Sequence, residues 1–128
     1  MVSLLNNTRR PDVTFHADGR IDITARLAKM LDLHDGDVIN IANDKSEYFL
    51  YVQHRADNLV GRHEAQCYPT NRRGRRNNNL RCHSKRLCNI ILALNADATD
   101  VRLPVGAPQQ HPLLGTILPI ITRNNIKR

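Results

Sequence analysis

Short stretches of alternating apolar and polar residues, each ended by a turn signal, occupy the first part of the chain. Residues 12–16 alternate, residues 20–23 alternate again, and Ala17-Asp18-Gly19 lies between them. Alternation with a period of two is typical of strands that bury one face, and Gly19 can adopt the positive φ that a tight turn requires. We therefore expect these two segments to pair as a hairpin, in a chain that is mainly β.

A short helix interrupts this pattern. Thr24 is a good helix N-cap, and the apolar residues that follow it fall at i, i+3 and i+4, which are Leu27, Met30 and Leu31. Residues 38–41 and 48–52 then read as two further strands around a turn at 43–46. The first half is therefore predicted to have the order β-β-α-β-β.

A similar order is predicted for the second half. Residues 65–68 and 80–83 are candidate strands, and Ser84 is a second candidate N-cap. The apolar residues after Ser84 again follow a helical spacing, at Leu87, Ile90, Ile91 and Leu94. Further along, the patterns predict a strand at 101–105, a loop at 108–111 and a final apolar strand at 115–122.

The two halves can be compared at an offset of 60 residues. At this offset five residues of the first helix fall on five of the second: Thr24, Arg26, Leu27, Met30 and Leu31 on Ser84, Arg86, Leu87, Ile90 and Ile91. An internal repeat and a coincidence between two amphipathic helices both explain this match. The predicted organisation is a polar basic arm (1–11), a first half (12–54), a linker (55–64), a second half (65–122) and a basic tail (123–128).

Positive charge is concentrated in one segment. The formal net charge is +7, and residues 62–86 hold eight basic residues against Glu64 alone, whereas the rest of the chain is balanced. The densest part is Arg72, Arg73, Gly74, Arg75 and Arg76. Such a cluster attracts a polyanion, and the planar guanidinium fork suits phosphate oxygens and the guanine edge. We expect a transcription-regulator-like protein with nucleic acid as its partner, DNA more than RNA, against the alternative of a solvated surface loop.

Two further observations bear on this nucleic-acid partner. Tyr68 is the only aromatic residue close to the arginine cluster in the sequence, which argues against a platform that stacks the bases of a single strand. Arg81 follows the cluster within the next candidate strand. The predicted contact residues of the second half are therefore Arg72, Arg73, Arg75, Arg76 and Arg81.

The segment from Gly19 to Ile23, then Leu27 and Leu31, then Leu33 to Ile41, resembles the AbrB-type (SpoVT-AbrB) swapped-hairpin domain, over about residues 12–54. The resemblance implies a DNA-binding β-barrel in which two β-β-α-β units interleave their hairpins. It also implies that Arg20 and Lys29 contact DNA. Thr24 replaces the usual proline of the family, and Ala28 replaces a common basic residue. If the halves are a repeat, the second half supplies the partner unit within one chain.

No pattern of catalytic residues is present, and we expect neither an enzyme nor a cofactor. Cys67, Cys82 and Cys88, with His63 and His83, are of the types that bind zinc, but no Cys-x2-Cys pair occurs. Buried thiols that pack as small apolar groups explain the three cysteines better. We therefore predict no metal site.

The location and the rival function follow from coarser features. No apolar run approaches the roughly 20 residues that span a bilayer, the apolar start of the chain is too short for a signal peptide, and three cysteines cannot all pair within the chain. We expect a cytoplasmic protein with no membrane contact, and leave a homo-oligomer open. The rival is an assembly protein of a virus or mobile element. In that case the basic segment faces packaged nucleic acid or an acidic partner protein, and residues 113–121 form contacts between subunits.

Overall fold

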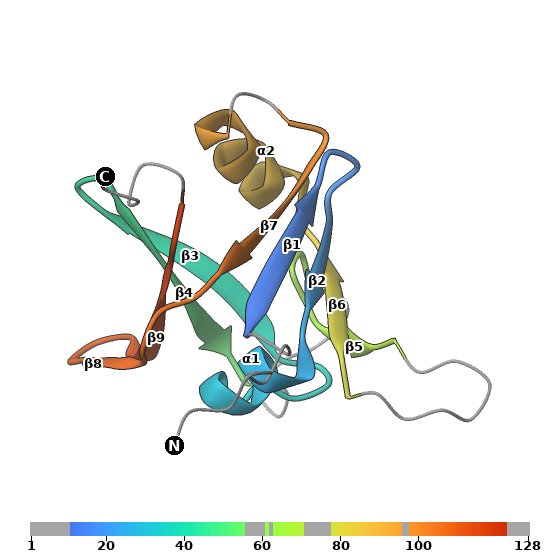
Figure 1. Ribbon diagram of the computed structural model, residues 1–128. Helices are drawn as coiled ribbons and strands as arrows, with labels where there is room; N and C mark the ends of the chain where they lie inside the picture. The colour runs from blue at the N-terminus through green and yellow to red at the C-terminus, as the bar shows by residue number, and fades with distance from the viewer. Residues whose placement is uncertain (1–10, 56–60, 62, 71–77, 96–97, 123–128) are drawn as a thin grey trace, which may run out of the picture.

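A computed structural model describes residues 11–55, 61, 63–70, 78–95 and 98–122 (Figure 1). Two helices and nine strands lie within these ranges, so the predicted α+β class, mainly β with two short helices, is confirmed. In chain order the elements are β1 (Asp12–His16), β2 (Arg20–Ile23), α1 (Ala25–Leu31), β3 (Val38–Asp44), β4 (Glu47–His54), β5 (Tyr68–Pro69), β6 (Leu80–His83), α2 (Lys85–Leu94), β7 (Asp100–Pro104), β8 (Gln109–His111) and β9 (Gly115–Ile120).

The strands form two antiparallel sheets. The five-stranded sheet has the order β5-β6-β2-β1-β7, and the four-stranded sheet has the order β3-β4-β9-β8. The predicted hairpin of residues 12–23 is confirmed as β1 and β2, with Val13 opposite Ile23 and Phe15 opposite Ile21. Its turn contains Gly19 at φ +99°, where Gly19 N donates to His16 O at 2.9 Å.

Each sheet contains strands from both halves of the chain. In the five-stranded sheet β2 lies beside β6, with Arg20 opposite His83 and Ile23 opposite Leu80. At the 60-residue offset that aligns the two helices, Arg20 corresponds to Leu80 and Ile23 corresponds to His83. The two pairs are therefore reciprocal, because each residue lies opposite the counterpart of the other. In the four-stranded sheet β4 of the first half lies beside β9 of the second, with Leu50 opposite Leu118.

The core lies between the apolar faces of the two sheets. Aliphatic side chains fill most of it, as expected for a chain with 4% aromatic residues. Phe15, Ile21, Leu50 and Leu118 are fully buried. The apolar residues of β9 (Ile117, Leu118 and Ile120) belong to this core. Within segment 113–121, all of which the structure describes, the one exposed large apolar side chain is that of Leu113, which is 88% exposed.

The two helices begin at the residues that the sequence predicted. The Thr24 hydroxyl accepts a hydrogen bond from Leu27 N at 3.4 Å, and the Ser84 hydroxyl accepts one from Leu87 N at 3.2 Å. The helices lie at opposite ends of the molecule (Figure 1). The part of the chain that the structure describes contains no helix long and apolar enough to cross a membrane.

Two predicted segments differ from the structure. The strand predicted at 65–68 is divided: Cys67 N donates to Asp37 O at 2.8 Å at the start of β3, whereas β5 pairs with β6. The loop predicted at 108–111 contains strand β8, which pairs with β9. Because Gln109 and Gln110 are polar, this strand depends on its tertiary partner and shows no alternation in the sequence.

The described strands do not close into the barrel that the sequence predicted. Outside the ladders, the two sheets are joined by isolated bridges between Val38 and Gln66 and between Val105 and Ile120. The chain passes from one sheet to the other at these points without extending the ladder. The result is two sheets packed against each other in place of one continuous barrel.

Candidate nucleic-acid interface

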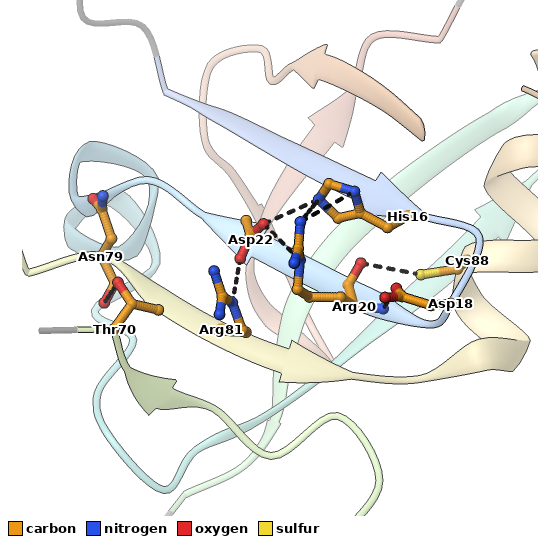
Figure 2. Close-up of polar contacts among 8 residues, drawn as sticks. All are labelled: His16, Asp18, Arg20, Asp22, Thr70, Asn79, Arg81 and Cys88. Carbon is orange, nitrogen blue, oxygen red and sulfur yellow. Dashed lines mark hydrogen bonds and ion pairs between the residues drawn. The ribbon is translucent and has the colours of Figure 1, made fainter. Parts of the chain in front are cut away.

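Asp22 connects two of the predicted contact residues, Arg20 and Arg81. Its Oδ1 accepts a hydrogen bond from Arg81 Nε at 2.6 Å, and its Oδ2 lies 3.2 Å from Arg20 Nε. His16 Nε2 lies 3.0 Å from the same Oδ2 (Figure 2). One carboxylate therefore holds side chains from β1, β2 and β6 in a single polar network.

This network lies on the outer face of the five-stranded sheet, because side chains alternate between the two faces of a strand. Ile21 and Ile23 of β2 are buried, so Asp22 points to the opposite face. Leu80 and Cys82 of β6 are buried in the same way, which places Arg81 and His83 on the outer face. The register then sets Arg81 directly opposite Asp22, and His83 directly opposite Arg20.

The charges of the network stabilise one another. Partial burial alone would raise the pKa of Asp22, but the hydrogen bonds from Arg81 and His16 outweigh burial and lower that pKa. The hydrogen bond to Asp22 raises the pKa of Arg81. Asp22 is therefore a carboxylate at neutral pH, and it offsets one of the two positive charges that Arg20 and Arg81 bring to this face.

Two rings lie next to the network on the same face. The rings of Tyr68 and His83 are stacked, with centroids 6.0 Å apart and planes inclined by 13°. Tyr68 is opposite Arg81 in the ladder between β5 and β6. Across the neighbouring strands β5, β6 and β2, the side chains therefore follow the order Tyr68, Arg81, Asp22.

The base of the β5–β6 hairpin is attached to α1. Thr70 N donates to Asn79 O at 3.1 Å, and Ala25 N donates to the Asn79 side-chain oxygen at 2.8 Å. The predicted contact residues between these two ends, Arg72, Arg73, Arg75 and Arg76, lie outside the described residues. The chain that carries them therefore leaves and re-enters the sheet beside the start of α1.

Lys29 lies apart from the Asp22 network. It is an exposed residue of α1 and lines a surface groove together with Arg26 and with residues from the base of the β5–β6 hairpin, Pro69, Asn78 and Leu80. The structure therefore brings Arg20 and Arg81 together, and places Lys29 near the ends of the segment that holds the arginine cluster.

All three cysteines are buried, as the sequence predicted. Cys67, which directly precedes β5, interacts with Cys82 of β6. A hydrogen bond with Cys67 together with burial raises the pKa of the Cys82 thiol well above its ordinary value. Cys88 Sγ donates to Arg20 O at 3.5 Å (Figure 2). Among the described residues, no three His, Cys, Asp or Glu side chains gather as metal ligands.

Sequence reasoning missed three members of this face: His16, Asp22 and His83. Asp22 and Arg81 are 59 positions apart, so their contact depends on the pairing of β2 with β6. Alternation in residues 20–23 and 80–83 was the available signal, since it places Asp22 and His83 on the faces opposite the apolar residues.

Comparisons of this chain with protein-family models, with curated proteins and with solved structures gave no match.

Proposed function

We propose that this protein binds DNA through the outer face of the five-stranded sheet and the arginine-rich segment that joins β5 to β6. The observation that carries the proposal is the placement of charge. Eight basic residues lie within 62–86 against one acidic residue, and the described ends of the arginine-rich segment, Thr70 and Asn78, adjoin the sheet that bears Arg20 and Arg81. The protein acts by occupying DNA and performs no chemistry on it.

The electrostatics support a contact with the phosphate backbone. Arg72, Arg73, Arg75 and Arg76 fall within five consecutive residues, and a cluster of this kind gains affinity by releasing condensed counterions from DNA. The only acidic residue of 62–86, Glu64, is engaged elsewhere: Arg86 donates to it at 2.7 Å and Ser84 at 2.6 Å. Glu64 therefore leaves the positive charge of the cluster unopposed.

A pseudo-dimer is the second part of the proposal. The two halves correspond to the two interleaved units of an AbrB-type protein, fused in one chain. The reciprocal pairing of Arg20 with His83 and of Ile23 with Leu80 supports this correspondence, as does the pairing of β4 with β9. The arginine cluster then occupies the hairpin position in the second half that Asp18-Gly19 occupies in the first.

The test is the salt dependence of binding. Fluorescence anisotropy with a labelled DNA oligonucleotide would be recorded from low to physiological salt for the parent and for a variant with Arg72, Arg73, Arg75 and Arg76 changed to Ala. The matched control removes four basic residues elsewhere: Lys45, Arg123, Lys127 and Arg128. Because both variants lose the same net charge, only the position of the charge differs between them.

We expect the loss of the cluster to weaken binding at low salt by about tenfold or more and to reduce the salt slope by about three to four units. The control should change both quantities much less. Equal losses in the two variants would indicate attraction by net charge alone. Absence of binding by the parent at low salt would reject the proposed function.

A further inference from the structure

The stacked rings of Tyr68 and His83 form an exposed aromatic surface beside the arginine network. Tyr68 is 40% exposed, and His83 is exposed as well. They belong to adjacent strands and share the outer face, because Tyr68 pairs with Arg81 and His83 follows two positions later. Neither ring is needed to fill the core, which lies on the other side of this sheet.

Guanidinium groups lie beside the rings on one side. Arg81 interacts with the Tyr68 side chain and with Asp22, and Arg20 lies opposite His83 in the ladder. A hollow next to the rings is lined by Gly36, His63 and Gln66, and also by the two acidic residues Asp35 and Glu64. Phosphates are therefore expected on the side of the rings that faces Arg81 and Arg20, and not in this hollow. Flat rings bind the faces of bases, and guanidinium groups beside them bind the phosphates that link the bases.

We infer that the Tyr68–His83 pair stacks an unpaired nucleobase, so that the preferred substrate is single-stranded DNA. The sequence argued against such a platform because it showed Tyr68 alone near the cluster, whereas the fold adds the ring of His83. In a duplex both faces of every internal base are covered by neighbouring bases, which leaves no face for a ring on a sheet surface. An unpaired base has a free face that can lie on the rings while Arg81 contacts a flanking phosphate. This inference rests on the proposed function and identifies the form of its substrate.

The experiment compares a single strand with its duplex. Anisotropy would be measured with a labelled mixed-sequence oligonucleotide, alone and annealed to its complement, for the parent and for Tyr68→Leu, Tyr68→Phe and His83→Leu. A second oligonucleotide with 2-aminopurine in the middle reports stacking directly, because its fluorescence falls when the base stacks on a ring. Tyr68→Phe is the matched control, since it keeps the ring and removes only the hydroxyl.

The inference predicts that Tyr68→Leu and His83→Leu each weaken single-strand binding by about fivefold or more, reduce the 2-aminopurine quenching, and change duplex binding less than twofold. Tyr68→Phe should keep the parent's quenching. Thermal unfolding of each variant, followed by circular dichroism, shows whether the sheet is intact, and the second ring variant provides the test if the first one unfolds.

The possible failures are distinguishable. If the parent binds duplex and single strand but the Leu variants keep full single-strand affinity and quenching, the stacking inference is wrong while the proposed function stands. Equal loss of duplex and single-strand binding in the Leu variants also overturns the inference, because it indicates a general contact. If the parent binds neither form at low salt, the proposed function fails and the inference fails with it.

Discussion

Asp22 and Arg81 join the two halves of the chain through a hydrogen bond of 2.6 Å between Oδ1 and Nε. They lie opposite each other in the β2–β6 ladder, at the centre of the five-stranded sheet. The same carboxylate contacts Arg20 and His16. This one acidic residue therefore both fixes the position of the arginines and reduces the positive charge of the proposed binding face.

Replacing Asp22 by Asn should separate these two effects. Because a negative charge beside the phosphates is removed, affinity for DNA at low salt should rise by about fivefold. The free energy of unfolding should fall by about 1–3 kcal/mol, because partly buried arginines lose a charged partner. Anisotropy and urea unfolding measure the two quantities.

Asp18→Asn is the control for Asp22→Asn. Asp18 lies in the adjacent turn, where its Oδ1 accepts a hydrogen bond from Arg20 N, and it takes no part in the network with Arg81. The Asp18→Asn substitution should raise the affinity for DNA by a smaller factor than Asp22→Asn does. Weaker DNA binding by the Asp22 variant than by the parent would contradict the account of this face.

The pH dependence of stability should change when Asp22 is replaced. The folded protein lowers the pKa of Asp22 below its unfolded value of about 4. A lowered carboxylate pKa contributes stability that is fully present above the unfolded pKa and is lost as the pH falls through the folded pKa. The difference in unfolding free energy between the parent and Asp22→Asn should therefore be constant near pH 6–7 and shrink below about pH 4. A difference that does not change with pH would show that the charge of Asp22 is not what stabilises the fold.

Gly19 should be more sensitive to substitution than Gly115. Both have positive φ, +99° and +79°. A Cβ at Gly19 would lie 3.3 Å from the backbone N and Cα of Lys85, whereas a Cβ at Gly115 meets no described atom within 4 Å. Gly19→Ala should cost about 2–3 kcal/mol of unfolding free energy, and Gly115→Ala about 1 kcal/mol. Urea unfolding compares them, and equal costs would show that the close approach of α2 to the hairpin turn does not matter.

The three thiols should be unreactive in the folded protein. Cys67, Cys82 and Cys88 are buried, so reagents have little access to them. The pKa values of Cys82 and Cys88 are also raised, which lowers the thiolate content of these two. A coloured thiol reagent at pH 8 should react slowly with the native protein and rapidly with three thiols after denaturation. Rapid labelling of the native protein would contradict the packing of β5 and β6 described above.

Local features of the fold could be read from the sequence because their signals are local. Thr24 and Ser84 are N-caps as predicted, and residues 80–83 form a strand as predicted. An N-cap depends on one hydroxyl and the turn that follows it, and an alternating strand depends on a few neighbouring residues. Strand β8 could not be read in this way, because polar residues 109–111 become a strand only by pairing with β9.

The candidate site was predictable only in part. Arg20 and Arg81 were identified from charge and from resemblance, but their common partner Asp22 depends on the register between strands from different halves. The stacking of Tyr68 on His83 depends on a hairpin whose two strands are separated by ten residues in the sequence. Many registers are compatible with a loop of that length, so the sequence alone does not determine which side chains meet.

Nuclear magnetic resonance of the labelled protein, titrated with an unlabelled DNA oligonucleotide, tests the location of the proposed interface most directly. Backbone amide signals would be followed as DNA is added at low salt. We predict that shifts concentrate on β2, Tyr68 of β5, β6 and residues 71–77, and that the amides of β8, Leu113 and Leu114 remain unchanged. Shifts that concentrate on the four-stranded sheet, or no shifts at all, would contradict it.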